Sequence, residues 1–318
     1  MARTESINAL EHFEWILRNP CLVEAEQFGY QTFCLPSENE LDELLAKAEG
    51  ELANYLSNTK SHFLGAYYEK LWAFFFEHSK RYELLYNGLQ IHGNGKTLGE
   101  FDFIVHDKQS QRYLHIETAI KFYLGTDDHC IESEHTKNWL WCGPRAIDRL
   151  DLKVNKLVTQ QLKLSESEQG KATLKSLRID EVVPTMLLQG HLCPPMLDLA
   201  KDWQSKLPQY AKSNNKTASW LRRSAAIDYL KQQRKVNNHL WKVLSKKEWL
   251  CMLSGQDEKE AYFKTDELIA RLEETYSGGI HYSPKEQGSI LVAEVDERTY
   301  TELQRIFVVQ DNWPNNHN

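Results

Sequence analysis

GEFDFI at residues 99–104 and HIETAIK at residues 115–121 are two stretches in which polar and apolar residues alternate. In the second stretch the alternation continues over residues 113–124, and a period of two residues is typical of a β-strand. A helix would make Glu117 and Lys121 an ordinary surface pair one turn apart, but it has no period of two. The two stretches therefore predict a β-hairpin, and the fold is built around it.

The register of this hairpin decides which polar side chains meet. If Gln109 and Ser110 form a two-residue turn, residues whose numbers sum to 219 face each other, so Asp102 faces Glu117. A four-residue loop keeps this pairing, whereas a loop of odd length shifts it. Directly opposed residues have β-carbons roughly 5 Å apart. The same register places Glu100 opposite Ala119 and diagonal to Lys121.

Two carboxylates at this distance repel each other, so the pair predicts a compensating cation. Carboxylate oxygens suit Mg²⁺, with Mn²⁺ as the alternative. A metal held by Asp102 and Glu117 could orient a water and polarise a phosphate for phosphodiester hydrolysis, and Lys121 could activate the water or neutralise developing charge. An exposed hairpin with a local salt bridge would have the same sequence, and this alternative stays open.

The composition is that of a globular protein rather than a membrane or secreted one. The chain has 318 residues, of which 41% are hydrophobic and 26% charged, and no apolar run reaches the length of a membrane span. The N-terminus lacks a signal-peptide core. Six scattered cysteines without a Cys-x-x-Cys pair predict free thiols in the reducing cytoplasm.

The net charge of −7 is unevenly distributed. Residues 201–247 contain twelve Lys and Arg against two acidic residues, a local excess of +10. Such segregation favours a basic surface for an anionic partner, and a lysine-rich linker is the alternative.

Hydrophobic spacing predicts the elements on both sides of the hairpin. Before residue 195 we expect helices over 5–17, 37–56, 61–78 and 144–162, and strands over 84–92 and 182–189. After Pro194-Pro195 we expect helices over 218–235, 265–276 and 299–306, and strands over 240–244 and 290–295. The change in character predicts two domains, residues 1–195 and residues 196–318.

Two of these helices carry further polar residues. In helix 61–78, Glu69 lies on a face of small residues that could approach a sheet closely. In the helix that begins near Pro144, four polar residues spaced 4, 3 and 4 apart form a stripe that could contact backbone phosphates. A solvated helix face would look the same. The stripe consists of Arg149, Lys153, Lys156 and Gln160.

Gly99-Glu100-Phe101-Asp102, followed by a strand that carries Glu117 and Lys121, resembles the PD-(D/E)XK nuclease superfamily. The resemblance implies an α/β fold with a restriction-endonuclease-like core, which runs helix, three-stranded meander, helix, strand over residues 61–189. N-terminal helices would precede this core, and a smaller C-terminal α/β region would follow it. The resemblance also implies that Asp102 and Glu117 bind the metal and that Glu69 is an accessory acid.

More closely, the chain resembles an uncharacterised bacterial family, the domain of unknown function 1853, over nearly its whole length. This second resemblance implies no particular activity. It rests on LGAYYE (64–69), GEFDF (99–103), HIETAIKFYL (115–124), the segment from Gly143-Pro144 to Asp148-Arg149-Leu150, and FVVQDNWP (307–314).

The spacing of the acid and the lysine departs from the superfamily pattern, in which they are two residues apart. Here Glu117 and Lys121 are four apart, and Ala119 stands two before the lysine. Four residues of strand span roughly 13 Å, against about 6.6 Å for two. Three explanations stay open: a bulge shortens the gap, Glu100 is the second acid near Lys121, or the site binds without cutting.

Other candidate sites are weaker. His129, Cys130 and His135 have loosely metal-like spacing, but no second cysteine pair completes a zinc site. Trp139, Trp141 and Trp313 could stack on bases, with buried packing as the favoured alternative. There is no P-loop, nucleophile elbow or dinucleotide-binding fingerprint.

Together these observations predict a metal-dependent phosphodiesterase acting on DNA or RNA. The alternative is an inactive nuclease fold that binds nucleic acid or protein. The predicted catalytic residues are Asp102, Glu117, Lys121, Glu69 and Glu100, with Asp102 and Glu117 as metal ligands.

Overall fold

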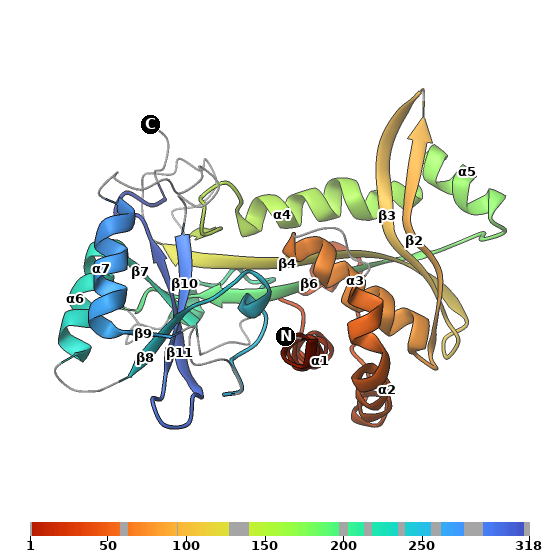
Figure 1. Cartoon of the computed structure of the whole chain (residues 1–318). Helices are drawn as coiled ribbons and strands as arrows, with labels where there is room; N and C mark the ends of the chain where they lie inside the picture. Colours follow the sequence, from red (N-terminus) through yellow and green to blue (C-terminus); the bar gives the residue numbers. More distant parts are fainter. Residues whose placement is uncertain are drawn as a thin grey trace. The chain divides into compact units, whose positions relative to one another are not determined.

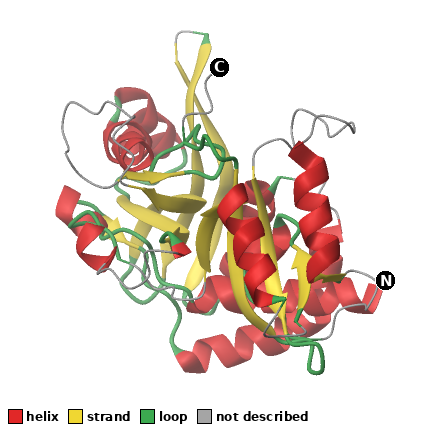
Figure 2. Ribbon diagram, turned by 90° about the vertical axis from the view of Figure 1, so that its left-hand side faces the viewer, coloured by secondary structure: helices red, strands yellow, loops and turns green. Residues whose placement is uncertain are grey.

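The computed structural model has a mixed α/β fold, which confirms the predicted class (Figures 1 and 2). Its contacts group the chain into two compact units. Unit 1 comprises Met1–Lys121, Asp151–Gly190 and Pro208–Asn214, and unit 2 comprises Phe122–Leu150, His191–Leu207 and Asn215–Asn318. The boundary predicted near residue 195 stays a prediction. The structure describes residues 2–57, 63–93, 95–126, 140–196, 203–212, 218–234, 239–255, 262–276 and 289–314.

Most of the first sheet belongs to unit 1, and its strands follow the order β1-β6-β4-β3-β2, with β5 paired to β4. The element order predicted for residues 61–189 is present: a helix (α3), the meander β2–β3–β4, further helical segments and then strand β6. Assignment of this core to the nuclease superfamily stays a prediction. The strands are β1 (Gln31–Thr32), β2 (Tyr82–Gly93), β3 (Lys96–Asp107), β4 (Arg112–Thr126), β5 (Leu140–Cys142) and β6 (Val183–Cys193). The helices before the meander are α1 (Ala2–Arg18), η1 (Ala25–Phe28), α2 (Glu38–Ser57) and α3 (Leu64–His78).

Helix α3 packs its apolar side chains against the sheet. Tyr68, Trp72 and Phe76 are fully or almost fully buried, and the ring of Phe76 lies 5.1 Å from that of Phe103 on β3. Burial of each such side chain contributes about 1.5–3 kcal/mol. This packing fixes the helix that carries Glu69 against the strand that carries Asp102.

The β3–β4 hairpin has the predicted register between Phe103 and Asp107, but the predicted pairing of Glu100 with Ala119 is not in this ladder. Its ladder pairs Phe103 with Ile116 and continues to Asp107 with Arg112, so the paired numbers sum to 219. A four-residue connection, residues 108–111, joins the strands, which is the loop length expected to preserve this pairing.

Asp107 holds the turn of this hairpin. Its carboxylate accepts hydrogen bonds from Arg81 Nε and Nη2 at 3.0 and 2.8 Å. It also accepts from the Gln109 backbone N–H at 3.0 Å and the Ser110 hydroxyl at 2.9 Å. The single acidic side chain thus connects the turn to Arg81 and to the backbone of the loop.

Strand β3 separates from β4 beyond Phe103, where the described β3–β4 ladder ends. The earlier residues of β3 continue to pair with β2, and Figure 1 shows this two-stranded ribbon rising away from β4. Asn87 pairs with Phe103 and Leu89 with Phe101, so Gly88 falls opposite Asp102. Gly88 has a φ of +70°, a conformation that favours glycine. The divergence therefore begins at Asp102.

The helix predicted from Pro144 begins later. Residues 143–149 form a turn in which the Gly143 N–H donates to the Asp148 carbonyl at 2.7 Å, and Ala146 has a φ of +56°. Helix α4 (Leu150–Lys156) then continues into a π-helical turn, η2 (Leu157–Gln161), and a 3-10 turn, η3 (Leu162–Glu166). Helix α5 (Glu168–Ser176) follows, with Ser167 as its N-cap. The prediction that Pro144 lies in the first turn of this helix is therefore wrong.

Unit 2 contains a second sheet with strand order β7-β11-β10-β8-β9. Its core combines side chains of the sheet with those of two helices, including Leu230, Trp241, Leu268 and Val292. The strands are β7 (Ala218–Arg222), β8 (Leu240–Val243), β9 (Phe263–Lys264), β10 (Ser289–Val295) and β11 (Glu302–Val309). The helices are α6 (Arg223–Gln233) and α7 (Thr265–Tyr276), with the 3-10 turns η5 (Trp203–Lys206) and η6 (Lys247–Trp249).

Two predictions in this region are wrong. Most of the helix expected over 299–306 lies in strand β11, which begins at Glu302 and pairs antiparallel with β10 and parallel with β7. The first five residues of the helix expected over 218–235 form β7. In both places the parallel pairing of β7 with β11, which are distant in sequence, overrides the local preference.

The basic segment, residues 201–247, is largely charge-compensated where it is described. Several of its side chains form ion pairs with acids from outside the segment, which weakens the interpretation as a uniform basic surface. The pairs are Lys212–Glu24, Arg223–Asp311, Lys231–Glu273, Arg234–Asp266 and Lys242–Glu248. Lys201, Lys216 and Lys235 lie outside the described residues.

Two further expectations concern membranes and thiols. Among the residues that the structure describes, no helix is both long and apolar enough to cross a bilayer. The described cysteines are free thiols, as predicted; they are Cys21, Cys34, Cys142, Cys193 and Cys251.

Candidate functional site

Asp102 lies where β3 leaves β4, and its side chain is tied to β4. Its Oδ2 accepts hydrogen bonds from the Thr118 backbone N–H at 2.8 Å and from the Thr118 hydroxyl at 3.1 Å. Thr118 lies beyond the last described ladder pair, Phe103–Ile116. The carboxylate therefore bonds to the backbone of β4 at the point where the β3–β4 ladder stops.

Glu117 is fully buried and held from two sides. Its Oε1 is hydrogen-bonded to His115 Nε2 at 2.9 Å, and its Oε2 accepts a hydrogen bond from Gln161 Nε2 at 2.7 Å. The backbone N–H of Asp102 also hydrogen-bonds to this carboxylate. Asp102 and Glu117 are therefore direct neighbours, as the predicted register requires.

His115 is a neutral link between Glu117 and the helical segment. Burial lowers its pKa to about 3, against the opposing charge of Asp102. Its Nε2 lies 2.9 Å from Glu117 Oε1, and its Nδ1 lies 3.0 Å from the Ser165 hydroxyl. The Ser165 hydroxyl also donates to the Leu162 carbonyl at 3.3 Å. The contact with Glu117 is thus a hydrogen bond with an uncharged ring and not an ion pair.

The two strand carboxylates carry more negative charge than their surroundings compensate. Burial, followed by the charge of Glu117, raises the pKa of Asp102 to about 7 despite the bonds from Thr118. Burial also raises the pKa of Glu117 to about 7, although Lys153, Gln161 and the Asp102 N–H oppose the rise. Two adjacent acids in this condition favour a bound cation.

Glu69 on α3 joins the same electrostatic cluster. As a whole residue, Glu69 is exposed. Partial burial of its carboxyl group nevertheless raises its pKa to about 7, and the charges of Asp102, Glu100 and Glu117 raise it further. Glu100 is exposed on β3 and pairs with Gln90 across the β2–β3 ribbon. The structure thus brings all four predicted acids into electrostatic contact.

The predicted lysine, Lys121, lies farther along β4 and is half-buried. Gly190 of β6 lies against its backbone, with a φ of +141°, and any side chain at residue 190 would clash with the Lys121 carbonyl. The gap of four residues between Glu117 and Lys121 remains. Both residues lie in β4. The described β3–β4 ladder has no register shift, but it ends at Ile116, before both of them.

The predicted phosphate-binding stripe is divided. Lys153 is half-buried and its Nζ donates to Gln161 Oε1 at 3.0 Å, whereas Lys156 and Gln160 are exposed. Arg149 belongs to unit 2, where its backbone forms an isolated bridge with Cys142. Only Lys156 and Gln160 have the exposure that was expected of the whole stripe.

Sequence reasoning missed His115, Gln161 and Ser165 as parts of this site. His115 could have been found, because it shares the alternation phase of Glu117 two residues later. Gln161 could not, because the π-helical turn η2 changes the direction in which residues after Lys156 project. Ser165 lies in the 3-10 turn that follows.

The weaker candidates separate into two groups. Trp141 and Trp313 are buried, with 3% and 0% of their surface exposed, so packing is the correct interpretation. Trp139, His129, Cys130 and His135 lie outside the described residues. Within the described part of the chain, no group of three or more His, Cys, Asp or Glu side chains is arranged to hold a metal.

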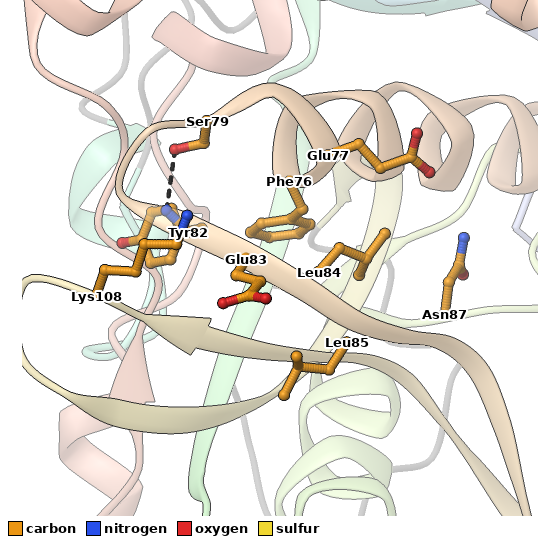
Figure 3. Close-up of a pocket in the computed structure, with 9 residues that line it drawn as sticks. All are labelled: Phe76, Glu77, Ser79, Tyr82, Glu83, Leu84, Leu85, Asn87 and Lys108. Carbon is orange, nitrogen blue, oxygen red and sulfur yellow. Dashed lines mark hydrogen bonds between the residues drawn. The ribbon is translucent and has the colours of Figure 1, made fainter.

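A pocket of about 390 Å³ lies elsewhere in unit 1, beside the edge strand β2 (Figure 3). Ser79, Tyr82 and Lys108 line one part of it, and Phe76, Leu84 and Leu85 line another. Asp102, Glu117 and Glu69 are not among its lining residues. The acid cluster is therefore distinct from this pocket.

The fold and the cluster define an α/β protein with paired acidic residues at the fork of a β-meander. The chain belongs to the family described as a domain of unknown function (DUF1853), whose model matches residues 11–309. No curated protein and no solved structure matches the chain.

Proposed function

We propose that this protein is a metal-dependent phosphodiesterase that acts on nucleic acid. The observation that carries the proposal is the contact between Asp102 and Glu117 at the β3–β4 fork. A divalent cation such as Mg²⁺ or Mn²⁺, when bound, would polarise the phosphate and lower the pKa of a water.

The bonds that hold the two acids are compatible with a cation. Asp102 makes both of its bonds to Thr118 through Oδ2, and each carboxylate oxygen has more than one acceptor direction. His115 and Gln161 would act as the outer-shell partners that orient Glu117, as such residues do in metal sites. Asp102 and Glu117 are therefore the proposed ligands.

The remaining acids and the exposed basic residues have supporting roles in this proposal. Glu69 and Glu100 add negative charge beside the two ligands. Lys156 and Gln160 are exposed on the helical segment that holds Glu117, and phosphate contacts require little beyond positive charge on a rigid element. A cytoplasmic location, suggested by the free thiols, belongs to the same proposal.

The test is cleavage of labelled DNA and RNA oligonucleotides, single- and double-stranded, with Mg²⁺, with Mn²⁺ and with a chelator. The expected result is cleavage of at least one substrate that requires the metal and that Asp102→Ala abolishes. Equal cleavage by wild type and Asp102→Ala, or no cleavage under any condition, would refute the enzyme proposal.

A non-catalytic nucleic-acid-binding module is the second candidate. It is favoured by the lack, among the described side chains, of a preformed group of three metal ligands. It predicts binding that is unchanged by Asp102→Ala and by chelation. Binding that requires the metal would count against it.

Replacing Lys156 with glutamine is expected to weaken nucleic-acid binding and to reduce its salt dependence. Loss of one phosphate contact should lower the slope of log affinity against log salt by roughly 0.9. Fluorescence anisotropy at several salt concentrations measures this slope. The matched control is Lys80→Gln, an exposed lysine that forms an ion pair with Glu43. Identical slopes for the two variants would exclude Lys156 from the interface.

A further inference from the structure

We propose that Lys153, anchored by Gln161, is the cationic side chain that serves the Asp102–Glu117 pair. This inference rests on the proposed function and deepens it, because it assigns to a helical residue the role that the sequence suggested for Lys121.

A chain of two hydrogen bonds connects Lys153 to Glu117. Lys153 Nζ donates to Gln161 Oε1 at 3.0 Å, and Gln161 Nε2 donates to Glu117 Oε2 at 2.7 Å. The amide of Gln161 therefore uses its acceptor for the ammonium and its donor for the carboxylate. Because one amide makes both bonds, the position of the ammonium is coupled to that of the carboxylate.

The electrostatic effects agree with this geometry. The charge of Lys153 is the strongest single influence that lowers the pKa of Glu117 against the effect of burial. In return, Glu117 and Asp102 both raise the pKa of Lys153, which burial and the charge of Lys121 lower. Lys153 thus interacts electrostatically with both Glu117 and Asp102.

Lys121 has a different relation to the site. It lies four residues from Glu117 on the same strand, a span of roughly 13 Å. The positive charge of Lys121 lowers the pKa of Lys153.

The π-helical turn η2 makes the Lys153–Gln161 contact possible. In an uninterrupted α-helix, residues eight apart differ in direction by about 80°. A π-helical turn closes its hydrogen bonds from residue i to i+5, so it turns the chain less per residue than an α-helix does. Inserted over Leu157–Gln161, it brings Gln161 back to the side on which Lys153 lies.

In this position Lys153 would stabilise negative charge that develops on the phosphate during cleavage. A preorganised ammonium in a partly desolvated site is effective for this purpose. Gln161 is a positioning residue in this scheme, since it acts through Lys153 and Glu117.

The experiment compares cation affinity with cleavage rate. Mn²⁺ binding to the full chain is measured by titration calorimetry for wild type, Lys153→Met, Lys153→Arg and Lys121→Met. Removing the positive charge beside the two acids should raise Mn²⁺ affinity about three- to tenfold while lowering cleavage roughly a hundredfold. Lys153→Arg should keep the wild-type affinity within about twofold, and Lys121→Met should change it less than Lys153→Met does.

A control variant and a spare variant keep the test decisive. Lys163→Met removes an exposed lysine of η3 and should change neither quantity. Lys153→Gln replaces Lys153→Met if the latter fails to fold. Equal Mn²⁺ affinity in wild type and the neutral Lys153 variant, or a larger change in Lys121→Met, would overturn the assignment to Lys153 alone. No Mn²⁺ binding by wild type would overturn the proposed cation site together with it.

Discussion

Asp102→Asn is expected to reduce metal-dependent cleavage at least a hundredfold, about the scale on which loss of one preorganised electrostatic contact acts. The same variant should increase the free energy of unfolding by about 1 kcal/mol, because it removes the repulsion between Asp102 and Glu117. The asparagine carbonyl can still accept the bond from the Thr118 N–H. Initial cleavage rates and urea denaturation at pH 7 measure the two effects.

The opposite signs of these effects distinguish a functional acid from a structural one. Asp42→Asn, at an exposed position of α2, is the matched control and should change neither quantity appreciably. A loss of stability in Asp102→Asn would mean that the carboxylate serves mainly to hold β3 on β4. In that case the proposed metal site would lose its principal ligand.

Asp107→Asn is expected to lower the free energy of unfolding by about 2–3 kcal/mol, because it leaves the Arg81 guanidinium without its anionic partner. The affected residues form the turn that sets the hairpin register. Denaturation of wild type, Asp107→Asn, Arg81→Gln and the double variant gives the coupling energy of the pair. A coupling energy near zero would show that the ion pair does not stabilise the turn.

The same carboxylate predicts a pH dependence. Burial alone would raise the pKa of Asp107, but Arg81 and the bonds from Ser110 and Gln109 hold it well below its usual range. A group with a lowered folded-state pKa contributes stability above its unfolded value of about 3.9, and this contribution is lost as the pH falls further. The difference in stability between wild type and Asp107→Asn should therefore be constant near neutral pH and shrink below about pH 4. A difference that stayed constant to lower pH would contradict the prediction.

The hairpin could be predicted from sequence because its information is local. A period of two residues identified both strands, and an even loop length fixed the pairing of Phe103 with Ile116. The neighbourhood of Asp102 and Glu117 followed from that register. The fork itself did not, because it involves a third strand, β2, in which Gly88 with its φ of +70° falls opposite Asp102.

The failures have a common physical origin in contacts between distant parts of the chain. Strand β11 has a helix-like spacing of apolar residues, but it is paired on both sides by β10 and β7. Lys153 was assigned to an exposed stripe, although it is half-buried and bonded to Gln161. The position of Gln161 depends on where the helix widens after Lys156, which the hydrophobic pattern does not indicate.

The π-helical turn also bears on how relatives in this family should be aligned. Such a turn accommodates one residue more than the α-helical turn that it replaces. Residues seven apart in an uninterrupted α-helix differ in direction by only about 20°. A relative with a one-residue deletion between the counterparts of Lys153 and Gln161 would therefore keep the two side chains on one side of a regular helix. In the alignment, a gap at that point would mean that the π-helical turn is lost while the contact between the counterparts of Lys153 and Gln161 is kept.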